Sequence, residues 1–406
     1  MPKYIVIDCG ARRLARGIYE PGGPGLTGLE VYPVKNADPL GLAAQFRAVC
    51  GAAADAAGRT DGILLAGSPE EFVLTDAVGA PVSGVFTGEN TVLKLIAGPE
   101  TALDRMRAEL GGKFSAAAGF KLKPATPFAA AAGYAAFKRL SGKLRVFTLP
   151  QWFAFHCGRF NGKVHETLAA GLGFYDIFER EPAAGLIGFA EKFSGCALES
   201  GQPVTDISAC AEFDGVPVYS GVGAAQCAVL GAGCRPAESV YIGVGAEAAA
   251  FAVAVRAPDA DILPYFDCMR LSAVYGLPGS NAARCLLAEF EPEQDAGVLL
   301  SSVTARQVEA TGGRQVSSGE TAGLSGGGIA ADRAAEALNG LAVSYAVAAR
   351  GIAPGGGLER CLLGGEPARS WRALGEMLER ELRVETQIVP ARNEVLSGLC
   401  RLADGF

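Results

Sequence analysis

The chain has 406 residues, half of them apolar and 19% charged, which is enough for the cores of about two or three domains. Its net charge is −7 and its Lys and Arg residues are scattered, which argues against binding to nucleic acid or to a membrane surface. The N-terminus lacks the pattern of a signal peptide, and Glu247 interrupts the longest apolar stretch, residues 241–255, so we expect a cytoplasmic protein.

In the N-terminal half, apolar runs predict strands that alternate with amphipathic helices. The expected strands are residues 4–8, 14–19, 29–34, 62–66, 71–76 and 82–86, and the expected helices are residues 40–57, 101–110, 129–140 and 148–155. Thr101 is the expected N-cap of its helix, which ends at Gly111 and Gly112. A second αβ segment is expected to end near Gly221.

The C-terminal half repeats this alternation. A helix over residues 224–231 leads to strands at 241–246 and 248–255, and a Gly- and Ser-rich loop covers 317–328. Beyond the loop, we expect a helix at 331–350, a strand at 361–365, a helix at 370–380 and a strand at 385–389. Strands and helices that alternate in both halves predict an α/β protein whose sheets are covered by helices.

Two short segments of the chain are nearly the same. Residues 4–11 read YIVIDCGA and residues 241–246 read YIGVGA, and each is followed by a second apolar run. This pattern is typical of a strand–turn–strand hairpin, and its repetition indicates a duplicated domain with a cleft between the halves. A glycine turn can direct backbone N–H groups at an anion such as phosphate. Such turns usually add a hydroxyl, but both copies here carry alanine, Ala11 and Ala246.

The chain contains eleven cysteines but no CxxC pair, and its only histidines are His156 and His165. We therefore expect reduced thiols, with neither a zinc site nor a disulfide framework. His156 lies on an apolar helix beside Trp152, and both are expected in the core or at its rim, with sugar stacking as the alternative for Trp152. Residues 323–327 fit G-x-S-x-G, but no histidine follows them, which argues against a hydrolase.

Residues 360–389 contain the most specific pattern in the chain. An apolar strand runs into Gly364-Gly365, and a helix follows whose N-terminus would face a nucleotide. On spacing alone, an ordinary strand–helix connection that needs a glycine turn is the alternative.

Together these segments resemble the FGGY family of carbohydrate kinases, within the actin–hexokinase–Hsp70 superfamily. The two hairpins are similar to that superfamily's phosphate motifs, and LLGGEPARSW is similar to its adenosine motif. Residues 147–177 match a helical and Ala-Ser-rich stretch of the family, and residues 216–233 and 263–279 most resemble its sedoheptulokinase-like branch. The resemblance implies two ribonuclease-H-like domains that flank a central cleft, with residues 1–233 on the sugar side and 234–406 on the nucleotide side.

The resemblance also implies ATP-dependent phosphorylation of a small sugar or polyol, assisted by Mg²⁺. Asp8 would help to hold the metal, and Glu89 and Gln226 would contact the substrate. The nucleotide would be bound by Asp8, Gly10, Gly245, Gly364, Gly365 and Glu366. A homodimer is left open.

The departures from the family pattern lie where catalysis is expected. The catalytic Asp of the family's Gly-Asp-x-Gln motif is Ala224 here, within Gly223-Ala224-Ala225-Gln226. Ala11 and Ala246 replace phosphate-binding hydroxyls, and Glu247 adds negative charge beside the second turn. The sugar-binding Trp-x-Asp-x-Arg motif is reduced to VFTGENT, residues 85–91. We therefore expect impaired kinase activity.

Three functions follow from these observations. The first is a working kinase in which Glu247, Glu89 or Asp267 replaces the missing carboxylate. The second is a pseudokinase that acts as a sugar or nucleotide sensor or as a scaffold for a partner. The third, a filament-forming assembly protein, has no dedicated motif in the chain.

Overall fold

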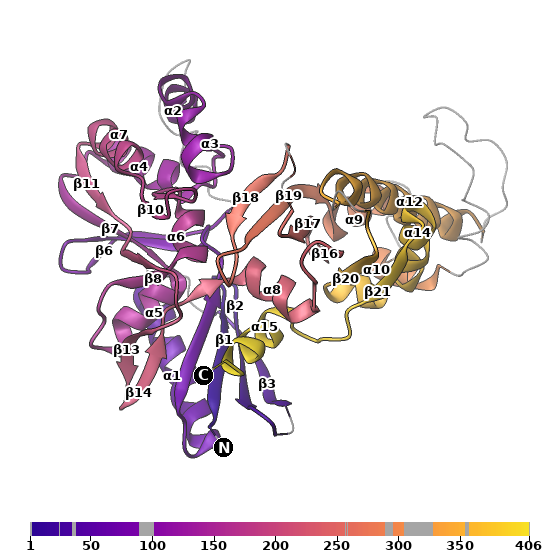
Figure 1. The fold of residues 1–406 in the computed structure, drawn as a ribbon, viewed down its shortest axis with the longest axis horizontal. Coiled ribbons are helices and arrows are strands. Elements are labelled where there is room, and N and C mark those ends of the chain that lie inside the picture. Colours follow the sequence, from indigo (N-terminus) through magenta and orange to yellow (C-terminus); the bar gives the residue numbers. More distant parts are fainter. Residues whose placement is uncertain are drawn as a thin grey trace. The chain divides into compact units, whose positions relative to one another are not determined.

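The computed structural model describes residues 2–23, 25–34, 38–88, 101–255, 257, 259–288, 295–303, 328–353 and 357–405. The chain forms two compact units (Figure 1). Unit 1 comprises residues 1–231, 263–269 and 395–406, and unit 2 comprises residues 232–262 and 270–394. Residues 263–269 therefore belong to unit 1 although they lie in the C-terminal half. The domain boundary expected after residue 233 stays a prediction.

A seven-stranded sheet in the order β13-β14-β4-β1-β2-β3, with β15 beside β4, forms the centre of unit 1. Strand β1 pairs with β2 in an antiparallel hairpin and with β4 in a parallel ladder. Successive side chains of a strand point to opposite faces, so Ile5 and Ile7 share the face that packs against Phe46 and Phe153 of two helices. The strands are β1 (Tyr4–Cys9), β2 (Arg13–Glu20), β3 (Gly25–Pro33), β4 (Gly62–Gly67), β13 (Ala209–Phe213), β14 (Val216–Tyr219) and β15 (Val222–Gly223).

A second sheet of unit 1 has four strands in the order β11-β7-β5-β6. Its apolar residues share a core with α2, α4 and α7, in which Phe72 and Phe86 stack with their ring centroids 4.5 Å apart. The strands are β5 (Phe72–Asp76), β6 (Pro81–Phe86), β7 (Gly142–Thr148) and β11 (Cys196–Glu199). Four short strands form two small sheets: β8 (Lys163–His165) with β12 (Gln202–Val204), and β9 (Tyr175–Asp176) with β10 (Glu181–Pro182).

Helices surround both sheets of unit 1 (Figure 1). They are α1 (Pro39–Ala57), α2 (Ala102–Leu110), α3 (Lys113–Ala118), α4 (Pro127–Lys138), α5 (Leu149–Cys157), α6 (Glu166–Leu172), α7 (Ala184–Ser194), α8 (Ala224–Ala232) and α15 (Glu394–Ala403). The local sequence explains several boundaries. Thr101 and Asp104 form the capping box of α2, which confirms the predicted N-cap, and Thr148 and Gln151 form another on α5.

Unit 2 is built on a six-stranded sheet in the order β18-β19-β17-β16-β20-β21. Strand β16 pairs with β17 in an antiparallel hairpin and with β20 in a parallel ladder, which repeats the relation of β1 to β2 and β4. The strands are β16 (Ser239–Val244), β17 (Glu247–Val253), β18 (Asp261–Pro264), β19 (Arg270–Pro278), β20 (Arg360–Gly364) and β21 (Glu385–Ile388). The helices are α9 (Ser280–Ala288), α10 (Ala296–Ser302), α12 (Gly328–Gly351), α13 (Glu366–Ser370) and α14 (Arg372–Leu382).

The predicted elements are present with shifted ends, but the prediction omitted several elements, among them α3, β7, β18, β19, α9 and α10. The helix expected over residues 370–380 is α14, which begins at Arg372 because the buried Trp371 lies outside the helical conformation at φ −102° and ψ 70°. The helix expected at 129–140 begins at Pro127, in the first helical turn where proline fits, and ends at left-handed Arg139. Asp214 and Gly215 both have positive φ, as the tight turn between β13 and β14 requires.

All eleven cysteines are free thiols, as expected. Among the described residues, no helix has the length and apolar character needed to cross a bilayer.

Candidate functional site

Parallel strand pairing in unit 1 brings distant segments to one edge of the central sheet. Asp8 at the end of β1 lies opposite Ala66 of β4, and Ala66 lies opposite Val222 of β15. The carboxyl ends of these strands meet at the same edge, so the turn at Gly10 and the start of α8 at Ala224 are neighbours. The structure therefore brings together the residues that the sequence assigned to the metal, to a phosphate and to the missing base.

The turn between β1 and β2 has two backbone donors that are already bonded. The Gly10 N–H donates to the Arg13 carbonyl oxygen at 3.0 Å, and a Cβ on Gly10 would lie only 2.9 Å from that oxygen. The Ala11 N–H donates to Oε2 of Glu71 at 3.0 Å. A carboxylate of the chain itself thus occupies the position at which the sequence predicted an anion.

Glu71 is held in this position by its own backbone. Its N–H donates to the Ser68 carbonyl oxygen at 3.3 Å, and its carbonyl oxygen accepts from the Leu149 N–H at 3.0 Å. Burial, together with the negative charges of Asp8 and Glu70, raises the pKa of Glu71 to about 7, against the hydrogen bond from Ala11 and the positive charge of Arg12. The carboxyl group therefore pays a desolvation cost when it ionises near Asp8.

Glu70, in the same loop as Glu71, contacts a different segment of the chain. A Cβ on Gly88 would lie 2.6 Å from Oε2 of Glu70, so this carboxylate lies against the segment that follows β6. Gly88 belongs to the region assigned to sugar binding. Glu89, the substrate residue predicted next to it, lies outside the described residues. Sequence reasoning missed Glu70 and Glu71, although two acidic residues in the short loop between the buried strands β4 and β5 were a usable signal.

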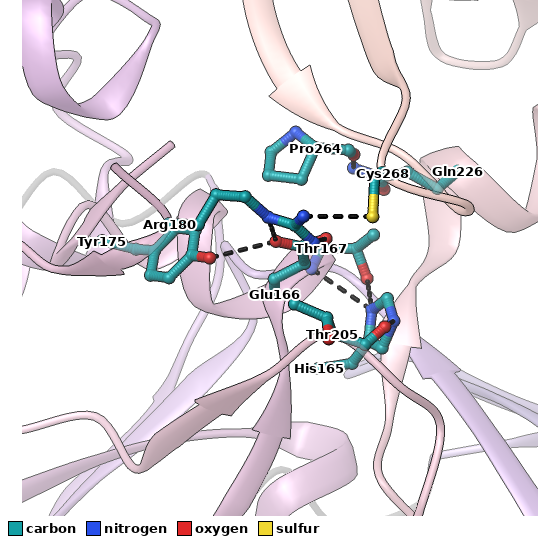
Figure 2. Close-up of polar contacts among 9 residues, drawn as sticks. All are labelled: His165, Glu166, Thr167, Tyr175, Arg180, Thr205, Gln226, Pro264 and Cys268. Atoms are coloured by element: carbon teal, nitrogen blue, oxygen red, sulfur yellow. Dashed lines mark hydrogen bonds and ion pairs between the residues drawn. The ribbon is translucent and has the colours of Figure 1, made fainter. Parts of the chain in front are cut away.

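A polar chain fixes the backbone next to Ala224, and its members Thr167, His165 and Thr205 are drawn in Figure 2. The Gly223 N–H donates to Oγ1 of Thr167 at 2.9 Å, and this hydroxyl lies 2.8 Å from Nδ1 of His165. Nε2 of His165 lies 2.9 Å from the carbonyl oxygen of Thr205. A carbonyl only accepts, so Nε2 carries the proton and Nδ1 accepts from Thr167. The start of α8 is therefore positioned by a neutral, fully buried histidine.

Gln226, the other predicted substrate residue, is committed to the fold. It is 3% exposed, and its Nε2 donates to the carbonyl oxygen of Pro264 at 3.1 Å. Pro264 lies in the segment 263–269, so this bond fixes α8 to that segment within unit 1 (Figure 2). The side chain serves here as a structural link.

An ion pair between the buried Glu166 and the partly exposed Arg180 lies beside the same chain of contacts (Figure 2). Arg180 contacts both oxygens of Glu166, with Nη2 to Oε1 at 2.8 Å and Nε to Oε2 at 3.2 Å. Glu166 also accepts from the hydroxyl of Tyr175 at 3.0 Å, and burial raises the pKa of that phenol. The remaining Nη1 of Arg180 lies 3.0 Å from Sγ of the exposed Cys268.

The corresponding turn of unit 2 is closed by backbone contacts. The Gly245 N–H donates to the carbonyl oxygen of Glu247 at 2.9 Å. Ala246 and Glu247 are both exposed. Glu247 therefore places a carboxylate at the surface of the turn where the sequence predicted phosphate.

Gly364 and Gly365 have a steric role that explains the glycine pair. A Cβ on Gly364 would lie 2.6 Å from the ring of Tyr241, and one on Gly365 would lie 2.1 Å from the carbonyl oxygen of Val244. Gly365 also has φ 96°, which only glycine adopts readily. Its N–H donates to Oε1 of Glu394 at 2.9 Å, and that carboxylate pairs with Arg369 at 2.9 Å.

The other residues considered from the sequence have these positions. Glu366 is exposed and accepts from the Ser370 hydroxyl at 2.9 Å. Trp152 is fully buried and donates to the carbonyl oxygen of Pro39, so its place in the core is confirmed. His156 packs edge-on against Trp152 with ring centroids 4.1 Å apart, and burial lowers its pKa. The G-x-S-x-G segment, 323–327, lies outside the described residues.

Unit 1 also contains a cavity of about 780 Å³, lined by Phe147, Phe155, Phe160, Phe174 and Leu198 among others. Among the described residues that the sequence assigned to nucleotide, metal or sugar, none lines this cavity.

Solved structures of similar shape show which fold this is. The match to the xylulose kinase from Rhodospirillum rubrum has a TM-score of 0.78 and 18% identity, and covers 99% of this chain and 89% of that one. The gluconate kinase from Lactobacillus acidophilus follows with a TM-score of 0.77 and 13% identity, over 99% and 88% of the two chains. The chain has the two-domain α/β fold of the carbohydrate kinases.

A glycerol kinase from Plasmodium falciparum, solved with ADP, shares this fold at a TM-score of 0.74 and 11% identity, over 99% of this chain and 89% of that one. No family model matches the sequence, and neither does any curated protein. This chain therefore has the carbohydrate-kinase fold with at most 18% sequence identity to the three kinases named here.

Proposed function

We propose that the chain is an FGGY-type carbohydrate kinase homologue, of the sedoheptulokinase-like branch, in which phosphorylation of a ketose or polyol is impaired. The observation that carries the proposal is the position of Ala224. It follows Gly223 directly, and Gly223 pairs with Gly67 at the strand edge that also holds Asp8. A methyl group at the start of α8 cannot accept a proton from a sugar hydroxyl. Loss of a general base typically costs about 10²–10⁴-fold in rate.

Among the described residues, no group of three or more His, Cys, Asp or Glu side chains could hold a metal ion, so a Mg²⁺ at this edge would depend on Asp8 together with phosphate oxygens and water. Carboxylate oxygens such as those of Asp8 are the ligands that Mg²⁺ prefers. ATP and Mg²⁺, when bound, would supply the phosphoryl group and offset its charge. However, the Ala11 N–H already bonds Glu71, and the Gly365 N–H bonds Glu394. With these N–H groups bonded within the chain, neither turn fits a nucleoside triphosphate, and we derive no catalytic step through one.

The same contacts favour a second candidate, a pseudokinase that binds a sugar or nucleotide as a sensor, or a partner as a scaffold. Intrachain carboxylates bond one turn N–H in each unit, so both turns are stable without an anion. A sensor needs only a ligand that binds the folded state better than other states. This candidate differs from the first only in whether any turnover remains.

A calorimetric titration with ATP–Mg²⁺, followed by a coupled ATPase screen over ketoses and polyols, tests the proposal. Turnover that is weak but above blank with one sugar class supports the impaired kinase. Sugar or nucleotide binding without turnover supports the sensor. Turnover in the ordinary range of kinases, about 1–100 s⁻¹, would overturn both.

A further inference from the structure

We infer that Glu71 is an internal occupant of the anion-binding turn at the end of β1, and that it keeps phosphate out of this turn. The inference rests on the proposed function, because it concerns the turn that the carbohydrate-kinase fold places beside the transferred phosphate. It goes further by naming the group that regulates access to that turn.

The first step of the argument is the bond itself. The Ala11 N–H donates to Oε2 of Glu71 at 3.0 Å, although the two residues are 60 positions apart in the chain. A carboxylate oxygen that accepts from a backbone N–H is chemically the same kind of partner as a phosphate oxygen. The one donor therefore cannot bind a phosphate while it binds Glu71 in this geometry.

The second step is that this contact does not arise from a freely moving surface side chain. The backbone N–H of Glu71 bonds to Ser68, and its carbonyl oxygen accepts from Leu149 at the first position of α5. Gly67, just before this loop, packs so closely on Pro150 that a Cβ would lie 2.7 Å from that ring. The loop is fixed at both ends, and it directs the Glu71 side chain at the turn.

The third step is the charge. Asp8 and Arg12 influence Glu71 electrostatically, and Glu70, which lies against Gly88, does so most weakly, so a phosphate at Ala11 would meet chiefly the carboxylates of Asp8 and Glu71 and one guanidinium. Like charges at short range disfavour each other strongly in a partly buried site. Removing the carboxylate of Glu71 removes both the competing acceptor and one of these charges.

The test compares three proteins at pH 8.5: the natural chain, Glu71→Gln and Glu70→Gln. The probe is inorganic phosphate, added at constant ionic strength against potassium chloride, with binding measured by thermal shift and by ³¹P line broadening. Glu70→Gln is the matched control, because it removes the same charge one residue away from a side chain that lies against Gly88. We expect phosphate to bind Glu71→Gln at least about tenfold more tightly than the natural chain, and Glu70→Gln within about threefold of it.

Equal affinity in the natural chain and in Glu71→Gln would overturn the inference, as would no binding to either. An equal gain in Glu70→Gln would also overturn it, because the effect would then be one of overall charge. If Glu71→Gln fails to fold by circular dichroism, Glu71→Ala, which leaves the Ala11 N–H open, takes its place. Phosphate binding uses no sugar and no turnover, so the assay separates failure of this inference from failure of the proposed function.

Discussion

The backbone N–H of Gly223 donates to the hydroxyl of Thr167 at 2.9 Å, one residue before Ala224. That hydroxyl contacts His165, whose ring also accepts from the Thr167 N–H at 3.3 Å as the N-cap of α6. The geometry at the start of α8 therefore depends on the protonation state of a histidine that does not reach the strand edge itself.

The first prediction concerns the loss of folding stability at acidic pH. Burial lowers the pKa of His165 below its ordinary value of 6.5, and Arg180 lowers it further, against Glu166 and Asp206. The unfolded chain then takes up a proton at higher pH than the folded one, so the stability from this group is complete above about pH 6.5 and falls as the pH drops below it. A proton on Nδ1 would also point at the Thr167 N–H, so that two hydrogen-bond donors would face each other.

Urea unfolding at pH 7.5 and pH 5.5 measures this effect. In His165→Asn the side chain still provides an acceptor for the cap but has no titrating group. We expect the natural chain to lose more stability between the two pH values than the variant does. Parallel losses in the two proteins would show that other groups cause the acid sensitivity.

The second prediction concerns the ion pair beside this chain of contacts. Glu166 is 4% exposed in its side chain, so Arg180→Ala would leave a buried carboxylate with Tyr175 as its remaining partner among those described above. We expect Arg180→Ala to lower the free energy of unfolding by about 2 kcal/mol, less than for a fully buried pair because Arg180 is partly exposed.

Arg159→Ala is the matched control for that change. Arg159 pairs with Glu212 at 2.7 Å, but its side chain is 80% exposed. Its removal should change the free energy of unfolding by less than about 0.5 kcal/mol. Similar losses in the two variants, measured by chemical denaturation, would contradict the structural role assigned to the Glu166–Arg180 pair.

The third prediction concerns the missing base. An aspartate at the first position of α8 suits a helix N-terminus, so Ala224→Asp should fold. We expect the single variant to show no ATP turnover above the natural chain, because Glu71 still occupies the turn at Ala11. Ala224→Asp combined with Glu71→Gln should show more turnover than the natural chain with a sugar present.

The control for the double variant is Ala225→Asp combined with Glu71→Gln, which adds the same carboxylate one position along the helix. A coupled ATPase assay with the same sugars should find no gain in that protein. If both double variants gain turnover equally, the assignment of Ala224 as the vacant base position is wrong.

The sequence predicted the fold through its local patterns. The hairpins at β1–β2 and β16–β17 carry their own turn glycines, and alternating strands and helices favoured the α/β class. The pairing of β15 with β4, which brings Ala224 to Asp8, is nonlocal and was not predicted. The resemblance to a known family implied only that Asp8 and Ala224 both occupy positions of its active site, so the fold class could be predicted without coordinates but this strand pairing could not.

The carboxylates that bond the turns could not be predicted in the same way. Glu71 and Glu394 contact backbone N–H groups 60 and 29 positions away, and neither belongs to a motif. Their choice of partner depends on loop geometry, such as the contacts of Ser68 and Leu149 with the Glu71 backbone. For Gln226 a family motif predicted a substrate contact, which stays a prediction, and nothing in the sequence indicated the hydrogen bond from this side chain to Pro264.

The fourth prediction concerns the glycine pair after β20, for which the sequence left a nucleotide turn and an ordinary connection as alternatives. A Cβ on Gly365 would lie 2.1 Å from the carbonyl oxygen of Val244, and φ is 96°. Gly365→Ala should therefore lower the free energy of unfolding by about 3 kcal/mol or more, whether or not a nucleotide binds.

Gly375, within α14, is the control, because a Cβ there would meet Ile388 at an ordinary 3.5 Å. Gly375→Ala should stay within about 1 kcal/mol of the natural chain. Thermal and chemical unfolding without ligand decide the matter, since a Gly365→Ala protein as stable as Gly375→Ala would remove the steric reason for the glycine and favour a ligand-binding one.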